Sequence, residues 1–213
     1  PFVMITRITD YINGMKTSTP EELGLPEGWH HFSSFLARSI NEAPPAIEFN
    51  TEADAAILQF TGGTTGTPKA ATLTHRNLVA ALYTGNEWGR SISEFIPIER
   101  RNIMGVLPCF HVFGEVCGIA MSTITVSTLI ILPRFDLDEF MSTMERIPHI
   151  WFFPAVATML GAILNHPRVE EINLAKKIAV INAGAAPCSL DLLQKAREMG
   201  FIISEGWGMS ETT

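Results

Sequence analysis

The stretch LQFTGGTTGTPK, residues 58–69, combines an apolar start, a run of glycines and threonines, and a closing lysine. Glycine lets a backbone approach a ligand closely and adopt positive φ angles. Threonine hydroxyls add hydrogen-bond donors and Lys69 adds a positive charge, so the stretch suits the oligophosphate of a nucleotide. The alternative is an ordinary turn rich in glycine and threonine, and the flanking residues help to choose between the two.

The residues on either side of this loop favour phosphate binding. Ala55–Phe60 is a short apolar run, which is typical of a buried parallel strand. Beyond the loop, apolar residues near helical spacing predict a helix over 74–88 with Thr74 as its N-cap. The sequence therefore predicts the order strand, glycine loop, helix. A Walker A loop is excluded, because its lysine follows glycine and precedes a hydroxyl residue, whereas Pro68 and Ala70 flank the lysine here.

The composition narrows the function classes. The 213 residues include 15 basic and 22 acidic side chains, a formal net charge of −7, and no basic stripe, which argues against a nucleic-acid partner. A hydrophobic content of 46% is enough for a sizeable core. Cys109, Cys117 and Cys188 lack C-x-x-C spacing, so they suggest neither a disulfide framework nor a zinc site and favour a cytoplasmic location.

Two stretches without charged residues, Val116–Pro133 and Ile147–Pro167, approach the length of a membrane span. The first becomes β-branched at its end, as a helix running into a strand would. The second contains Pro148 and Pro154, which suits a strand followed by a helix. We therefore expect buried elements, no transmembrane segment and no signal peptide. Association with a membrane surface and the oligomeric state stay open.

The chain is expected to have two parts. Residues 1–50 are expected to form an irregular, turn-rich lead-in with one short helix over 29–39, in which His30 and His31 form a solvated face and not a metal site. Residues 51–213 are expected to form an α/β nucleotide-binding core. The sequence begins without methionine and ends inside a loop, so we expect it to be a piece of a longer protein.

Strands and helices are expected to alternate within the core. Strands are predicted at 55–60, 103–107, 128–132, 149–153, 178–182 and 201–204, and helices at 74–88, 112–126, 136–146, 155–165 and 189–199. Asp136 and Glu139 form a capping pattern for the third helix. This alternation predicts a mainly parallel sheet flanked by helices, whose ligands bind beyond the carboxyl ends of the strands.

Three further segments follow predicted strands and carry unusual residue sets. PCFHVFG (108–114) places His111 between two phenylalanines, and NAGAAP (182–187) offers small residues against which a flat ring or an acyl chain can lie. EGWGMSETT (205–213) offers an aromatic face, a hydroxyl and a carboxylate, and Mg²⁺ prefers such oxygen ligands together with phosphates. Taken singly, each segment also fits an aromatic cluster, a strand-to-helix turn or a polar loop. Their joint occurrence favours a site.

Together the four segments resemble the adenylate-forming superfamily, which contains acyl-CoA synthetases, aryl-CoA ligases, luciferases and peptide-synthetase adenylation domains. TGGTTGTPK matches the superfamily's phosphate-loop signature, and the other three segments match its later motifs in the same order. The resemblance covers nearly everything from residue 54 to residue 213. The residue sequences of the loop and of PCFHVFG are most similar to those of long- and medium-chain fatty-acid–CoA ligases. The resemblance implies part of the large domain of an acyl-CoA synthetase-like fold.

The resemblance also implies a reaction and its site. A carboxylate attacks the α-phosphate of ATP to give an acyl-adenylate and pyrophosphate, and the thiol of coenzyme A then displaces AMP. His111 would line the entrance for the carboxylate and the acyl group, and Glu211 would hold Mg²⁺. The phosphate contacts would come from Thr61, Gly62, Gly63, Thr64, Thr65, Gly66 and Lys69, and the adenine, acyl and α-phosphate contacts from Gly184, Ala185, Ala186, Trp207, Gly208 and Ser210.

The sequence departs from the family pattern in two places. Ala70 stands where the family usually has glycine, and Trp207 stands where it usually has an adenine-stacking tyrosine. Tryptophan keeps the stacking face but lacks the hydroxyl. The family's ribose-binding aspartate, hinge and C-terminal lid domain with its adenylation lysine are expected after Thr213, so the isolated segment is expected to be inactive. An aryl-CoA ligase, another adenylating enzyme and a non-catalytic nucleotide-binding module remain as alternatives.

Overall fold

The computed structural model describes residues 3–5, 24–39, 43, 45–61, 66 and 69–212. The chain divides into two compact units, Pro1–Glu48 and Phe49–Thr213. The expected phosphate contacts of Gly62, Gly63, Thr64 and Thr65 lie outside the described residues.

In the first unit, β1 (Val3–Ile5) pairs in parallel with β2 (Trp29–His31), and α2 (Phe32–Ser39) follows directly. The predicted helix over 29–39 is therefore wrong at its start, because pairing with a strand distant in the sequence holds the first three residues extended. His31 is only 2% exposed, and its Nδ1 lies 2.6 Å from the Ser33 hydroxyl. The prediction of a solvated helix face for His30 and His31 is wrong.

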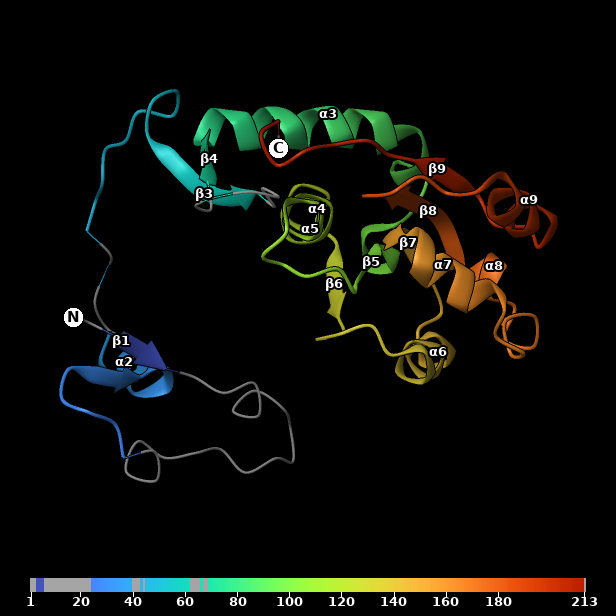
Figure 1. Ribbon diagram of the computed structural model, residues 1–213, viewed down its shortest axis with the longest axis horizontal. Helices are drawn as coiled ribbons and strands as arrows, with labels where there is room; N and C mark the ends of the chain where they lie inside the picture. Colours follow the sequence, from blue (N-terminus) through green and yellow to red (C-terminus); the bar gives the residue numbers. More distant parts are fainter. Residues whose placement is uncertain are drawn as a thin grey trace. The chain divides into compact units, whose positions relative to one another are not determined.

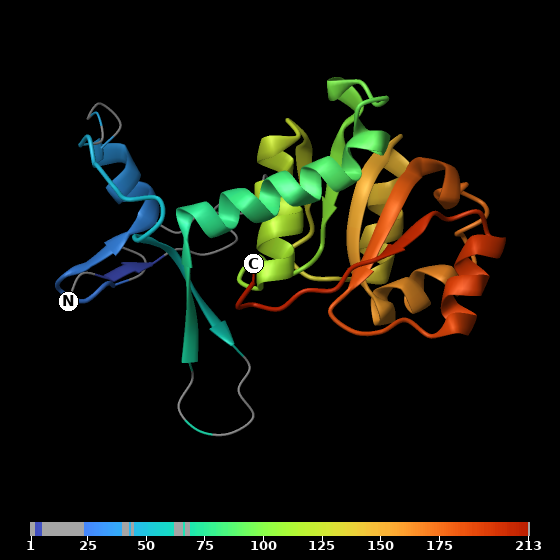
Figure 2. The ribbon, with the colours of Figure 1, turned by 90° about the horizontal axis from the view of Figure 1, so that it is seen from above.

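The second unit is built on a five-stranded sheet in the order β6-β5-β7-β8-β9, and all its pairings are parallel (Figures 1 and 2). In chain order the strands are β5 (Asn102–Gly105), β6 (Thr128–Ile131), β7 (Ile150–Val156), β8 (Ile178–Gly184) and β9 (Ile203–Glu205). Helices connect these strands, as crossovers between parallel strands require. The predicted parallel α/β architecture is confirmed.

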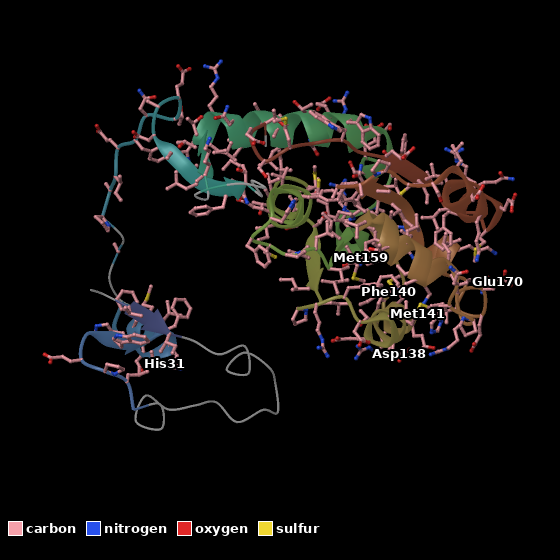
Figure 3. The ribbon with its side chains drawn as sticks, in the orientation of Figure 1. His31, Asp138, Phe140, Met141, Met159 and Glu170 are labelled. Carbon is pink, nitrogen blue, oxygen red and sulfur yellow. The ribbon has the colours of Figure 1, made fainter. Side chains whose placement is uncertain are left out.

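One face of the sheet packs on the larger apolar cluster of the unit. This cluster includes side chains from the helices α6 (Leu137–Arg146), α7 (Ala157–Leu164), α8 (Leu174–Lys177) and α9 (Leu190–Glu198). Phe140 and Met141 project from α6 into it, and the Phe140 ring stacks on Phe153 with centroids 5.3 Å apart (Figure 3). Asp136 accepts a hydrogen bond from the Glu139 amide at 3.0 Å, so its predicted role as N-cap of α6 is confirmed.

The opposite face packs on a second cluster that includes Ile103, Met121, Trp151 and Val180. Two helical regions lie on this side. The first is α3 (His75–Ser93), and the short 3₁₀ turn η2 (Ile98–Arg100) follows it. The second consists of three consecutive segments, α4 (Val112–Gly114), η3 (Glu115–Ala120) and α5 (Met121–Ile124). In β5 the neighbouring residues Ile103 and Met104 contribute to different clusters, because side chains alternate between the two faces of a strand.

The helix predicted over 112–126 contains a π-helical segment, η3, between two short α-helical pieces. Such segments occur often at functional sites, because the extra residue redirects the side chains around it. Close packing fixes the start of this helix. A Cβ atom on Gly114 would lie 2.3 Å from the carbonyl oxygen of Pro108, so only glycine fits there.

The glycine loop lies in a different context from the one predicted. β3 (Ala55–Thr61) pairs antiparallel with β4 (Lys69–Thr74) in a separate two-stranded sheet, with Thr61 opposite Lys69 (Figure 2). Leu58 and Phe60 are 60% and 65% exposed, so the predicted buried parallel strand is wrong. The loop connects the strands of a hairpin and does not follow a strand of the parallel sheet.

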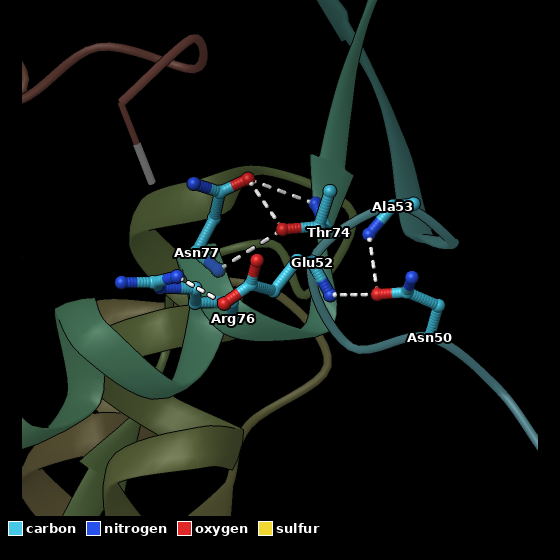
Figure 4. Close-up of polar contacts among 6 residues, drawn as sticks. All are labelled: Asn50, Glu52, Ala53, Thr74, Arg76 and Asn77. Atoms are coloured by element: carbon cyan, nitrogen blue, oxygen red, sulfur yellow. Dashed lines mark hydrogen bonds and ion pairs between the residues drawn. The ribbon is translucent and has the colours of Figure 1, made fainter.

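Helix α3 joins the hairpin to the rest of the unit. It begins where β4 ends, and Thr74 is its N-cap in a capping box with Asn77, as predicted for Thr74 (Figure 4). Arg76 pairs with Glu52 beside this cap. Further along α3, a Cβ atom on Gly89 would lie 3.7 Å from the Trp151 ring, so the backbone of α3 lies close to this side of the sheet.

Candidate active site

A cavity of about 310 Å³ opens at the carboxyl ends of β5, β8 and β9. Three of the sequence segments meet there, although they are far apart along the chain. Its lining residues are His111, Val112, Phe113, Val116, Cys117, Asn182, Gly184, Ala185, Gly206, Trp207, Gly208, Met209 and Ser210. The volume is at the lower end of the range for small-molecule sites, and the position is where parallel sheets bind ligands.

His111 is the N-cap of α4, and its ring is held in a defined state. Its Nδ1 accepts a hydrogen bond from the Phe113 amide at 3.1 Å, so the Nδ1 atom carries no proton in this arrangement. The Nε2 atom remains for other contacts and carries the proton of the neutral ring. The side chain is exposed at the cavity wall, where it can donate a hydrogen bond to a ligand oxygen.

The end of β8 forms a narrow part of the cavity. A Cβ atom on Gly184 would lie 3.1 Å from two carbons of the Phe113 ring and 3.2 Å from the Gly206 carbonyl oxygen. Ala185 follows with a left-handed φ of 65°, which non-glycine residues seldom adopt and which is often found at ligand sites. The chain therefore makes a sharp turn at the cavity, where Gly184 has no side chain and Ala185 has only a methyl group.

The loop after β9 supplies the opposite side. The Gly206 amide donates to the Ala183 carbonyl at 2.8 Å, which fixes the start of this loop against β8. Trp207 is 85% exposed, so one face of its ring is free for stacking. Gly208 and Ser210 also line the cavity, whereas Ala186 and Glu211 are exposed and are not among its lining residues.

The remaining expected phosphate residues lie at the end of the hairpin. Thr61 and Lys69 are partners in the β3–β4 register, and the Thr61 hydroxyl donates to the Lys69 carbonyl at 3.3 Å. Gly66 has a φ of +100°, and a Cβ atom there would meet nothing within 4 Å. None of these residues lines the cavity at the sheet. The structure thus brings the three strand-end segments together, and the hairpin carries the described phosphate-loop residues separately.

A second cavity of about 590 Å³ lies on the hairpin side of His111. Its lining residues are Ile57, Leu58, Gln59, Phe60, Cys109, Phe110, His111 and Glu115. The Gln59 amide donates to the Phe110 carbonyl at 3.0 Å and so ties β3 to the segment that carries His111. His111 therefore separates a cavity at the sheet from a cavity at the hairpin.

Burial raises the pKa values of three groups, two of which, Cys117 and Glu115, line these cavities. It raises the pKa of the Cys117 thiol to about 11, so this thiol is neutral at physiological pH. The pKa of Cys188 rises through burial and through the nearby charge of Glu205. The pKa of the Glu115 carboxyl also rises through burial. All three cysteines are free.

Sequence reasoning missed several of the residues that line the cavity at the sheet. It did not single out Val112, Phe113, Val116, Cys117, Asn182, Gly206 and Met209 as site residues. Two spacings could have identified some of them. Val112 and Val116 are at i, i+4 and so share a helix face, and Asn182 and Gly184 are at i, i+2 and so share a strand face. Phe113 could not be identified in this way, because its contact with Gly184 depends on how β5 and β8 are arranged in the sheet.

Other parts of the described chain constrain the interpretation. None of the described helices combines the length and the apolar character that a membrane crossing requires. No group of three or more His, Cys, Asp or Glu side chains gathers at one point among the described residues. The arrangement at the sheet instead offers an imidazole, a hydroxyl, an exposed aromatic face and a partly apolar wall, which suits an acid joined to a nucleotide.

Comparison with known proteins agrees with this geometry. The family model described as "AMP-binding enzyme" matches residues 9–213. A long-chain-fatty-acid–CoA ligase of Bacillus subtilis is 30% identical over 185 residues, which cover 86% of this chain and 32% of that protein. A 4-coumarate–CoA ligase-like protein of Arabidopsis thaliana is also 30% identical, over 85% of this chain and 32% of that protein. The chain spans about a third of the length of these relatives.

Solved structures show the same fold. The ATP-bound MatB from Rhodopseudomonas palustris has a TM-score of 0.68 and 26% identity, over 80% of this chain and 32% of that chain. The o-succinylbenzoate CoA synthetase of B. subtilis in complex with an acyl-adenylate intermediate has a TM-score of 0.67 and 27% identity, over 91% of this chain and 37% of that chain. This chain belongs to the AMP-binding enzyme family.

Proposed function

We propose that the natural protein activates a fatty acid in two steps. A carboxylate oxygen attacks the α-phosphorus of ATP, the bond to the bridging oxygen breaks, and pyrophosphate leaves an acyl-adenylate behind. The thiol of coenzyme A then attacks the acyl carbonyl, AMP leaves, and the thiol proton passes to solvent. The observation that supports this best is the cavity in which His111, Gly184 and Ser210 meet at the end of the parallel sheet.

Five residues of the cavity have roles in this proposal. Trp207 stacks on the adenine, and the small residues Gly184 and Ala185 let the ring and the acyl group approach the backbone. Ser210 binds the α-phosphate, and the Nε2 proton of His111 meets the carboxylate at the entrance. Together they hold the carboxylate close to the α-phosphorus, and positioning of this kind supplies much of the catalysis in such reactions.

The hairpin loop holds the β- and γ-phosphates, with Lys69 as the charged group. Mg²⁺ fits this donor set, because it commonly takes one or two carboxylates and completes its shell with phosphate oxygens and water. Glu211 is exposed in the turn after β9 and next to Ser210, so its oxygens are available to a metal. When bound, Mg²⁺ neutralises the charge of the phosphates.

ATP–pyrophosphate exchange by the full-length natural protein tests the substrate class. Palmitate, octanoate and 4-coumarate are compared at equal concentration. We expect exchange to be fastest with one of the two fatty acids. Fastest exchange with 4-coumarate would overturn the fatty-acid assignment in favour of an aryl-CoA ligase, for which the similarity to a 4-coumarate–CoA ligase-like protein is the supporting observation.

Two variants test the nucleotide site. Lys69→Ala should raise the KM for ATP about tenfold or more, because it removes a charge from the phosphates. Glu211→Ala should raise the Mg²⁺ concentration needed for half-maximal exchange. Lys176→Ala, on α8 at the opposite end of β8, is the control for Lys69→Ala and should leave both values unchanged. Normal kinetics in both site variants would overturn the assignment.

The 213-residue chain alone should form no measurable thioester and bind ATP weakly at best, because the family's lid domain carries the adenylation lysine. Thioester formation by the isolated chain, followed by mass spectrometry, would refute this. We also propose a cytoplasmic location, in keeping with the free cysteines.

A further inference from the structure

The two walls of the cavity at the sheet differ in polarity. The helical wall consists of Val112, Phe113, Val116 and Cys117, and the Cys117 thiol is neutral. The strand wall carries Asn182, whose amide offers two hydrogen-bond donors and one acceptor. A site for hydrocarbon alone would need no such group.

The backbone of Asn182 is fixed by the sheet. β8 lies between β7 and β9, and Asn182 is in register with Pro154 on one side and Ser204 on the other. It shares a strand face with Val180 and Gly184, because side chains alternate along a strand. Val180 is 2% exposed and belongs to the apolar cluster. Asn182, two residues later, lines the cavity, so the same strand face changes there from an apolar side chain to an amide.

The amide is available to a ligand. No hydrogen bond joins the Asn182 amide to another group in the described part of the chain. Every fully buried side-chain nitrogen or oxygen in that part has a partner, so the unpaired amide is not fully buried and a ligand can reach it. It lies against Gly206, where a Cβ atom would be 2.8 Å from Asn182 Oδ1 and 3.3 Å from Nδ2. The absence of a side chain at residue 206 therefore leaves room for the amide.

The other polar side chains of the cavity have partners or roles. His111 Nδ1 is bonded to the Phe113 amide, and under the proposed function His111 Nε2 and Ser210 meet the carboxylate and the α-phosphate. Asn182 is then left for the body of the acid. An alkyl chain against it would leave the amide desolvated without a partner, which is unfavourable, whereas a hydroxyl or carbonyl oxygen would pair with it.

Resting on the proposed function, we propose that Asn182 selects acids that carry a hydroxyl or oxo group on the acyl chain or ring. The residue acts on specificity and takes no part in bond making. A site built to pair with such a group discriminates against the analogue that lacks it, because the protein amide is then left unpaired.

The test is ATP–pyrophosphate exchange by the full-length natural protein with matched acids. The pairs are octanoate with 3-hydroxy-, 5-oxo- and 8-hydroxyoctanoate, and cinnamate with 4-coumarate. We expect kcat/KM to favour the oxygenated member of at least one pair by about tenfold. In Asn182→Leu, a change of similar size without hydrogen bonds, this ratio should fall about tenfold, mainly because the unsubstituted acid improves.

Two further variants make the result specific. Gly206→Ala should also lower the ratio, because its methyl group occupies the space of the amide and displaces it. Asn165→Leu makes the same chemical change on the exposed end of α7 and should leave the ratio as in the wild type. Circular dichroism of each variant confirms that it is folded.

The outcomes separate the two proposals. Equal or better use of the unsubstituted acid in every pair by the wild type, or an unchanged ratio in both Asn182→Leu and Gly206→Ala, would overturn the role of Asn182 while the proposed function stands. No exchange with any acid would overturn the proposed function and this inference with it.

Discussion

The β3–β4 hairpin and the five-stranded sheet both begin as apolar stretches of sequence, yet they differ in how they are stabilised. In the sheet, Ile103 and Phe153 are fully buried between two helical layers. In the hairpin, Leu58 and Phe60 are mostly exposed, and pairing with β4 provides the backbone hydrogen bonds. An apolar run therefore marks a strand, but its burial depends on what packs against it. Four experiments on the chain test this contrast.

The largest effect is expected from removing a core ring. Phe153→Ala should lower the free energy of unfolding by about 3–5 kcal/mol, because it leaves a cavity beside Phe140. Phe60→Ala on the hairpin is the matched control and should cost less than about 1 kcal/mol. Urea unfolding measures both. Similar losses would mean that the hairpin is as tightly packed as the sheet.

The same contrast explains how far the sequence could predict the fold. The alternation of strands and helices from β5 to β9 could be predicted, because each element there has its own apolar pattern and caps such as Asp136 are local. β4 was missed because KAATLT has one large apolar residue and becomes a strand only by pairing with β3. The strand predicted at 55–60 is present as β3, but its predicted parallel and buried setting is wrong, because it pairs antiparallel with β4 outside the main sheet.

The candidate site was predictable where one segment carries its own chemistry. His111, Trp207 and Ser210 could be identified from their motifs, and the structure brings all three to one cavity. Phe113 could not, because its contact with Gly184 arises only in the assembled sheet. Glu211 keeps its predicted role as a proposal.

Backbone packing gives the second test. Gly114→Ala should cost about 2 kcal/mol or more, because the new methyl group meets the Pro108 carbonyl at 2.3 Å and neither backbone can move freely. Gly66→Ala on the hairpin loop meets open space, so only its φ of +100° opposes alanine, at about 1 kcal/mol. Thermal unfolding compares them. A harmless Gly114→Ala would mean that α4 can shift.

The third test uses pH to probe the covered wall of the cavity. The Cys117 thiol has its pKa raised by burial to about 11, from an ordinary value of 9.0. Between these values the unfolded chain loses a proton that the folded chain keeps, so stability falls as pH rises from 9 towards 11. We expect the wild type to lose about 2 kcal/mol more than Cys117→Ala over this range. Equal losses in urea unfolding would show that the thiol is solvated.

The smallest effects are expected at the helix caps, where the two regions should behave alike. Thr74→Ala at the start of α3 and Asp136→Ala at the start of α6 each remove a side-chain acceptor from a helix amide. Each should cost about 1 kcal/mol. A much larger loss for Thr74→Ala in urea unfolding would mean that the cap also holds the hairpin in place.

The hydrogen bond from Gln59 to the Phe110 carbonyl makes the two regions mechanically dependent on each other. Gln59 lies two residues before the expected phosphate contact Thr61, and Phe110 lies one residue before His111. Because Gln59 is 7% exposed, water cannot readily replace this bond. A displacement of β3 would therefore pull on the segment that carries His111, which borders both cavities.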